Sequence, residues 1–138
     1  MTLQFDFIGI VTADLPASLG FYRALGVDVP HGQEQAPHAE ATLPGGMTLA
    51  WDPVSTIRRF MPDFELPVAG GGRIGFACRA QSAAEVDRAY AELVQQYPAA
   101  AHTEPWDAPW GQRYATVLDP DGNSIDLYAP LDPEAAAS

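Results

Sequence analysis

One order of local sequence patterns occurs twice along the chain, and this repetition constrains the fold more than any other feature. Each half begins with a short apolar run, residues 5–11 and 73–78, of the kind that forms a buried strand. A helix is predicted after each run, because Asp14-Leu15-Pro16 and Ser82-Ala83-Ala84-Glu85 are both typical helix beginnings. Gly26 is expected to end the first helix, since glycine readily adopts the left-handed backbone of a helix cap.

Three short strands are predicted after each helix. In the first half they span about 27–30, 38–43 and 47–52, and in the second half about 99–103, 112–118 and 123–129. A glycine-containing turn, Pro44-Gly45-Gly46 or Asp119-Pro120-Asp121-Gly122-Asn123, separates the last two strands of each half. The sequence therefore predicts an α+β fold made of two tandem βαβββ modules.

These modules are expected to form a single domain over residues 1–130. Module one takes about 3–52, a linker rich in proline and glycine takes 53–72, and module two takes about 73–130. The remaining residues, 131–138, are predicted to be a flexible tail. A length of 138 residues agrees with one domain, since most domains have roughly 100–150 residues.

The charge balance argues against several classes of partner. Seven Lys and Arg residues against 18 Asp and Glu residues give a formal net charge of −11. Such a chain is not expected to bind nucleic acid or anionic membranes, because both are bound through clusters of cations. The one cysteine, Cys78, cannot form a disulfide within the chain, and there is no cationic signal segment or long apolar run. We therefore expect a cytoplasmic protein.

Two stretches of the sequence are similar to one known superfamily. The first is Phe7-Ile8-Gly9-Ile10-Val11 with Asp14-Leu15, Ser18 and Phe21-Tyr22, and the second is Asp119-Pro120-Asp121-Gly122-Asn123-Ser124-Ile125-Asp126-Leu127. Together they resemble the vicinal oxygen chelate superfamily, which includes glyoxalase I, extradiol dioxygenases, fosfomycin-inactivating enzymes and bleomycin-resistance proteins. The resemblance covers residues 3–130. It implies that the sheets of the two modules curl into a cup with helices outside, and that two chains often pair as a homodimer.

The same resemblance implies where a metal ion would be held. Metal-using members place His, Glu or Gln side chains in the cup from the first and last strand of each module. The residues at the matching positions here are Phe7, Ala50, Arg73 and Asp126. Only Asp126 offers an oxygen ligand, so we predict that the usual metal site is absent and that no cofactor is bound. A displaced metal site formed by His38, Glu40 and Asp126 remains an alternative.

The least generic stretch is residues 104–114, where Trp106, Trp110 and Tyr114 lie among prolines. One interpretation is a loop whose tryptophans form an aromatic wall for a ligand, and the other is packing over the sheet edge or against a second chain. An inward-facing Arg73 can form an ion pair with Asp126, whereas Arg73 or Arg113 can instead bind a ligand carboxylate or phenolate.

These observations predict metal-free binding of a small aromatic molecule, with sequestration of a basic antibiotic as the most concrete version. The predicted ligand-binding residues are Phe7, His38, Glu40, Phe60, Arg73, Trp106, Trp110, Arg113, Tyr114, Asp126 and Tyr128. Two alternatives remain open. One is a metal-dependent lyase, isomerase or dioxygenase of the same superfamily with displaced ligands, and the other is a dimeric module without a small ligand.

Overall fold

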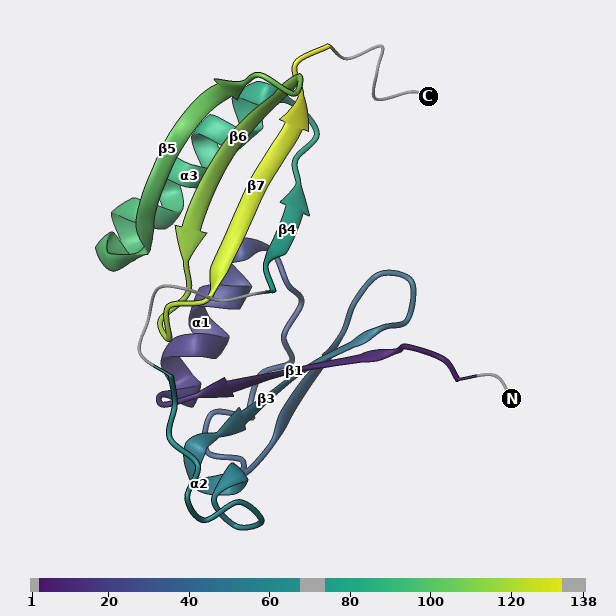
Figure 1. The fold of residues 1–138 in the computed structure, drawn as a ribbon, viewed down its shortest axis with the longest axis vertical. Helices are drawn as coiled ribbons and strands as arrows, with labels where there is room; N and C mark the ends of the chain where they lie inside the picture. Colours follow the sequence, from purple (N-terminus) through teal and green to yellow (C-terminus); the bar gives the residue numbers. More distant parts are fainter. Residues whose placement is uncertain (1–2, 68–73, 133–138) are drawn as a thin grey trace. The chain divides into compact units, whose positions relative to one another are not determined.

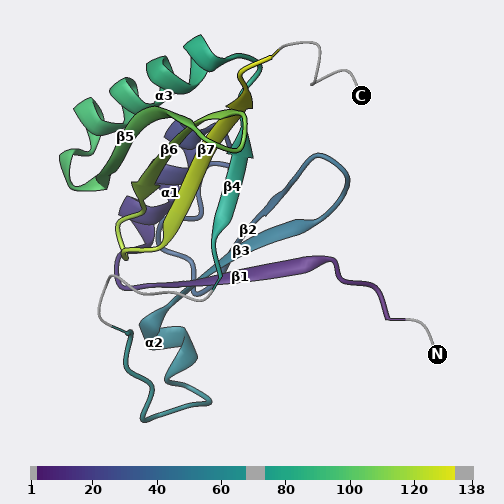
Figure 2. The same cartoon turned by 45° about the horizontal axis from the view of Figure 1, so that its top comes forward.

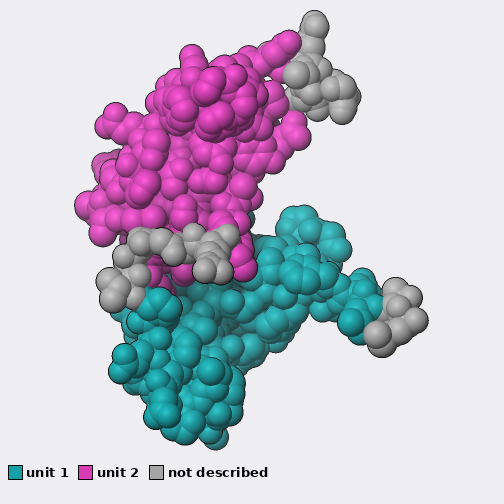
Figure 3. Space-filling view, in the orientation of Figure 1, with its two compact units in different colours: residues 1–68 teal, residues 69–138 magenta. Residues whose placement is uncertain are grey.

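A computed structural model describes residues 3–67 and 74–132 of the chain, and these residues form two compact units. Unit 1 is Met1–Val68 and unit 2 is Ala69–Ser138, drawn in different colours in Figure 3. The boundary between them falls inside the segment 53–72 that the sequence predicts to be a linker. Each unit has a sheet and helices of its own, and each is described separately below.

Unit 1 contains a three-stranded sheet in the order β1-β3-β2 (Figure 1). Its elements in chain order are β1 (Phe7–Thr12), α1 (Leu15–Leu25), β2 (Ala39–Thr42), β3 (Thr48–Pro53) and the short helix α2 (Val54–Ile57). Strand β1 lies parallel to β3, and β2 is antiparallel to β3. Gly45 and Gly46 form the β2–β3 turn with positive φ angles, which confirms the predicted hairpin.

Helix α1 begins and ends where the sequence predicts. The Asp14 carboxylate accepts a hydrogen bond from the Ala17 amide at 3.1 Å and thereby caps the first turn. Gly26 ends the helix with φ at 110°, a conformation that side chains disfavour. The Tyr22 ring packs edge-on against Trp51 of β3, with 5.5 Å between ring centroids. Trp51 is fully buried and is one of the largest side chains in the core.

The strand predicted at 27–30 is wrong, because residues 27–38 form a loop in the structure. The Arg23 guanidinium binds the loop carbonyls that a sheet neighbour would otherwise take: Nε donates to Val29 at 3.1 Å and Nη2 to Pro30 at 2.9 Å. The apolar residue that suggested a strand, Val29, is buried as a single side chain. Among its described residues, unit 1 therefore has one strand fewer than a βαβββ module.

Unit 2 contains a four-stranded sheet in the order β4-β7-β6-β5. Its elements are β4 (Phe76–Arg79), α3 (Ala83–Gln96), the 3₁₀ turn η1 (Pro98–Ala100), β5 (Ala101–Ala108), β6 (Gln112–Leu118) and β7 (Ser124–Pro130). Strand β4 is parallel to β7, and the other neighbours are antiparallel. Helix α3 covers one face of this sheet (Figure 2). This unit has the full predicted βαβββ order.

Strand β5 is longer than predicted and includes part of the tryptophan segment. The sequence predicted a strand over 99–103 followed by a loop, but the strand continues to Ala108. Its pairing with β6 shifts register between Thr103 and Trp106, and Pro105 lies within that irregularity. A proline is tolerated there because β5 is an edge strand that needs hydrogen bonds on one side only.

Burial alternates along β7. Ile125 and Leu127 are buried, whereas Ser124 and Asp126 remain partly or fully exposed. Because successive side chains of a strand point to opposite faces, the buried set lies toward α3 and the other set lies on the open face. The fold is thus α+β with two mixed sheets, as predicted. Among the described residues, no helix combines the length and the apolar character needed to span a bilayer.

The cap of α3 gives a direct test of unit 2. The Ser82 hydroxyl oxygen accepts the Glu85 amide at 3.1 Å, so Ser82→Ala leaves that amide without its side-chain partner. We expect the free energy of unfolding, measured by urea titration, to fall by about 1 kcal/mol. Ser82→Thr keeps the acceptor oxygen and should stay close to the parent protein. Equal stability of the alanine and threonine variants would contradict this account of the cap.

Candidate functional site

The open face of the unit 2 sheet, the face opposite α3, carries a group of polar and aromatic side chains. Strand register brings them together: Thr116 of β6 lies opposite Asp126 of β7, and Tyr114 lies opposite Tyr128. Residues in register on neighbouring strands share a face, and their Cβ atoms are then roughly 4.5–5.5 Å apart. The predicted site residues Tyr114, Asp126 and Tyr128 therefore lie on one surface.

Asp126 is the polar centre of this surface. Its Oδ2 accepts a hydrogen bond from the Tyr114 hydroxyl at 2.5 Å, and its Oδ1 accepts one from the Thr116 hydroxyl at 2.9 Å. The hydrogen bond to this carboxylate is the main reason that the pKa of Tyr114 is raised to about 12. Tyr114 therefore stays a protonated donor at neutral pH, and the carboxylate is held in one orientation by two neutral hydroxyls.

Three aromatic rings continue this surface, two of them exposed and that of Tyr114 half-buried, and we call Trp106, Trp110 and Tyr114 the aromatic row. Trp106 and Trp110 meet edge-to-face with centroids 5.5 Å apart, and Trp110 meets Tyr114 in the same way at 5.2 Å. The indole of Trp110 also donates to the Gln112 side chain at 2.9 Å. Trp106 is 41% exposed and Trp110 is 57% exposed, so a fixed but largely uncovered apolar surface adjoins Asp126.

Arg113 lies on the other face of the sheet, although the sequence analysis grouped it with the ligand-binding residues. Its Nε donates to Asp87 of α3 at 2.8 Å and its Nη1 donates to Asp107 of β5 at 2.9 Å. Both carboxylates stabilise the guanidinium and raise its pKa. Since Arg113 and Tyr114 are adjacent in β6, they point to opposite faces. Arg113 joins the helix to the sheet and is not part of the surface around Asp126.

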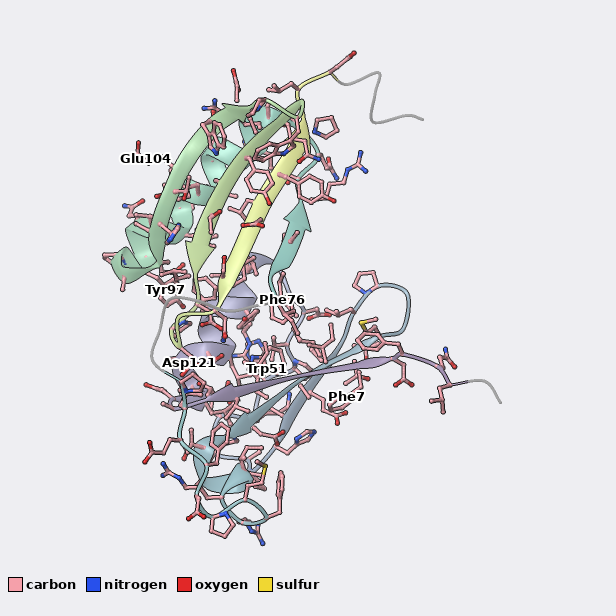
Figure 4. The ribbon with its side chains drawn as sticks, in the orientation of Figure 1. Phe7, Trp51, Phe76, Tyr97, Glu104 and Asp121 are labelled. Carbon is pink, nitrogen blue, oxygen red and sulfur yellow. The ribbon has the colours of Figure 1, made fainter. Side chains whose placement is uncertain are left out.

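A second cluster lies in unit 1, around His38. Its Nδ1 is 2.6 Å from Oδ1 of Asp52, and its Nε2 is 2.8 Å from Oε2 of Glu40. Hydrogen bonds to Asp52 and, next, to Glu40 raise the pKa of the imidazole above its ordinary value. The ring of Phe7, which projects from β1 (Figure 4), is parallel to that of His38, with 6.4 Å between centroids. His38, Glu40 and Phe7 are thus brought together, as expected for residues on one face of that sheet.

One further predicted site residue, Phe60, belongs to neither cluster, and another, Arg73, is not described. Phe60 follows α2 and is 68% exposed. Arg73, with its predicted ion pair to Asp126, lies outside the described residues. Among the described residues no ion pair to Asp126 is formed.

The donor set does not fit the divalent ion that the resemblance implies. At the matching positions, Phe7 presents a hydrocarbon ring, Ala50 is a fully buried methyl group, and Asp126 already accepts two hydroxyl donors. Divalent metals require several oxygen or nitrogen donors. The alternative set fares no better, because both nitrogens of His38 face carboxylates. Within residues 3–67 and 74–132, no three His, Cys, Asp or Glu side chains are arranged to hold a metal ion.

Thr116 and Gln112, which support Asp126 and Trp110 respectively, are not among the residues that the sequence predicts for the site. The alternation of β6 carried the necessary signal, since both residues are an even number of positions from Tyr114 and therefore share its face. Asp87 and Asp107 are likewise not predicted from the sequence as partners of Arg113. The contact with Asp87 joins helix α3 to a strand residue 26 positions later, and nothing in the local sequence indicates it. Asp107 is only six positions from Arg113, but it lies beyond the predicted end of the strand 99–103, so its pairing with β6 was not expected.

The environment of Tyr114 predicts an unusual titration. In a protein with ¹³C-labelled tyrosine, we expect one ring signal to titrate near pH 12, and to be absent from Tyr114→Phe. In Asp126→Asn the amide oxygen still accepts a hydrogen bond but carries no charge, so the pKa of Tyr114 should fall toward its ordinary value near 10. A Tyr114 signal that is unmoved by Asp126→Asn would show that the carboxylate is not the cause.

Comparison with known proteins agrees with this fold. A glyoxalase/bleomycin resistance protein/dioxygenase from Nocardioides is 27% identical over 96% of this chain and 86% of its own, with a TM-score of 0.71. A protein from Agrobacterium tumefaciens solved by NMR is 26% identical over 94% of this chain and 98% of its own, with a TM-score of 0.70. A family enzyme from Burkholderia phytofirmans PsJN is 15% identical over 94% and 100% of the two chains and has a TM-score of 0.76, which shows a shared fold alone.

The curated proteins gave no match. The family model for the glyoxalase/bleomycin resistance protein/dioxygenase superfamily matches residues 4–127. Because that match spans both units and nearly the whole chain, this protein belongs to the glyoxalase/bleomycin resistance protein/dioxygenase superfamily.

Proposed function

We propose that the open face of the unit 2 sheet binds a small aromatic molecule that carries a positive charge, and that it does so without a metal ion. The observation that carries this proposal is the aromatic row next to the Asp126 carboxylate. The rings supply apolar area for a flat ligand, and the carboxylate supplies a charge that would pair with a cationic group.

The apolar part of the site supports useful affinity. Covering about 100 Å² of each tryptophan would contribute up to about 2.5 kcal/mol at roughly 25 cal/mol per Å². The edge-to-face contacts already hold the rings, so little side-chain freedom is lost when a ligand covers them. Rigid rings favour binding more than mobile ones of equal area.

The polar part supports selectivity for a cation. Asp126 accepts hydrogen bonds from two hydroxyl groups, which do not cancel its charge. By contrast, the two carboxylates around Arg113 are both paired with its guanidinium. The protein's net charge of −11 also attracts cations from a distance. Binding of this kind suits sequestration of a basic aromatic compound, such as an antibiotic.

Other parts of the proposal come from the sequence. Phe7, His38, Glu40 and Phe60 of unit 1 stay predicted ligand contacts. A homodimer and a cytoplasmic location are also proposed, the latter in keeping with a single cysteine that cannot form a disulfide within the chain. The side chains of Phe7, Ala50 and Asp126 do not supply the donor atoms that a metal-dependent reaction would need.

The test uses two probes that share one ring system. We expect 9-aminoacridine, a planar cation, to bind more tightly than acridine-9-carboxylate, a planar anion, in fluorescence titrations with chelator present. Trp106→Ala with Trp110→Ala should weaken binding of both probes by at least about tenfold, because each ring covers area on either ligand. Asp126→Asn should weaken binding of the cation alone. Trp106→Phe with Trp110→Phe is the matched control and should keep most of the affinity.

Two results would overturn the proposal. If the double alanine variant becomes monomeric in size-exclusion chromatography with light scattering while probe binding is unchanged, the rings serve a subunit contact. If the protein retains a stoichiometric divalent metal after purification, and a chelator abolishes probe binding, the site depends on a metal ion.

A further inference from the structure

Residues 29–38 of the 27–38 loop in unit 1, which we call the loop 29–38, are tied to the elements around them largely through side-chain hydrogen bonds. At its beginning, Arg23 binds the carbonyls of Val29 and Pro30 and also the Glu34 carboxylate, at 2.9 Å. In its middle, the Gln33 amide accepts from the Glu40 backbone N–H at 3.0 Å and donates to the Glu40 carbonyl at 3.0 Å. At its end, His38 contacts Asp52 and Glu40. These contacts take the place of the strand that the sequence predicts nearby.

The end contact differs from the others because it depends on a proton. A neutral imidazole has one N–H donor and one bare nitrogen, whereas an imidazolium has two donors. Both nitrogens of His38 lie within hydrogen-bond distance of a carboxylate oxygen, at 2.6 and 2.8 Å. The observed geometry is therefore fully satisfied only by the protonated ring. In the neutral ring, one carboxylate faces a nitrogen lone pair and is repelled.

The loop forms part of the wall of a cavity of about 370 Å³ within unit 1. Loop residues 34–37 line it on one side, and Ser55, Thr56 and Arg59 line it from α2 and the residues that follow. The Thr56 hydroxyl donates to the Pro37 carbonyl at 2.5 Å, directly before His38. Movement of the His38 end of the loop would therefore alter this wall.

We propose that His38 is a proton-operated clamp, which ties the end of the loop 29–38 to the sheet through Asp52 and Glu40 and loosens when the imidazole loses its proton. The groups that face the ring are Asp52 of β3, Glu40 of β2 and the uncharged Phe7 of β1. No cation of the described chain forms an ion pair with either carboxylate besides His38 itself.

The two carboxylates determine in which direction the clamp depends on pH. They raise the pKa of His38 in the folded protein, so the clamp's contribution is complete below the ordinary value of 6.5 and is lost as pH rises through the raised value. Asp52 makes the shorter contact and its side chain is only 23% exposed, so the remaining N–H should stay on Asp52. Glu40, with a side chain that is 52% exposed, is then the group that moves away.

Hydrogen exchange measured by NMR tests the clamp at named amides. The reporters are the amides of Glu40 and Ala36, which are bound to the side chain and the carbonyl of Gln33 at 3.0 Å each. The Val27 amide, bound to the Tyr22 carbonyl at the end of α1, is the internal control. Rates are divided by the intrinsic exchange rate at each pH, and the pKa of His38 is measured from its ring nitrogen signals in the same samples.

We expect local opening at Glu40 and Ala36 to rise with pH along the titration curve of His38, while opening at Val27 stays constant. The rise should be about tenfold for every pH unit by which the measured pKa exceeds 6.5, since both quantities report one free energy. Opening that is constant through the titration of His38, or equal changes at Val27, would overturn the proposal.

Two variants separate a clamp from a merely structural histidine. In Glu40→Gln the neutral ring can donate to Asp52 and accept from the new amide, so protection should be kept at high pH. The pH dependence should become smaller, because only Asp52 still favours the protonated ring. In His38→Gln the loop should show, at every pH, the weaker protection that the parent protein shows above its transition. Arg23→Gln loosens the other end of the loop and is the control, whose added opening should be independent of pH. A Glu40→Gln variant with unchanged pH dependence would contradict the role of the second carboxylate.

Discussion

The structure of unit 2 depends on one constraint, the packing of alternate residues of β6 and β7 against α3. Ile125, Leu127, Ala115 and Val117 are all buried, and their burial fixes which face of each strand is apolar. A slip of one residue would expose this set and bury Asp126 and Tyr114 instead. The same packing therefore sets both the core and the composition of the open face. Arg113 reinforces it from the edge of that core by joining β5 and β6 to α3.

Asp126 stands at a position that matches a metal ligand of the family, but its carboxylate is bound by hydroxyl groups. The resemblance implies a His, Glu or Gln ligand at this point of the last strand in metal-using members, and Asp126 still offers an oxygen there, but the other matching positions that are described carry a ring and a methyl group. Here the Tyr114 and Thr116 hydroxyls occupy the two oxygens. Hydroxyl donors stabilise a carboxylate without neutralising it, so the surface stays anionic and available to a positively charged partner.

Much of this arrangement could be predicted from local sequence. Asp14, Gly26 and Ser82 mark the helix ends, since each satisfies backbone groups within a few residues. The Asp119–Asn123 turn fixed the register of β7, and hence the face of Asp126. The predictions failed where contacts with residues outside the local sequence determine the structure. In the loop at residues 27–30, Arg23 takes the carbonyls of Val29 and Pro30. The β5 strand persists through Pro105 because pairing with β6 outweighs the local break.

Side-chain partners were the least predictable part of the site. His38 and Glu40 share a face by simple alternation, but the contact with Asp52 requires the pairing of β2 with β3. The same is true of Arg113, whose residue type suits a ligand anion equally well until the position of α3 is known. Alternation assigns residues to faces, whereas only the tertiary structure decides which charges are already paired.

The parallel pairing of β4 with β7 affects when unit 2 can complete its fold during synthesis. Among the strands of the described residues, β4 pairs with β7 alone, and β7 comes 45 residues or more after it, beyond every other element of the unit. During synthesis α3 and the β5–β6 hairpin can form from neighbouring residues, but β4 has no partner until β7 has left the ribosome. Completion of this half should therefore be a late and cooperative event, with premature release leaving an unpaired strand edge open to aggregation.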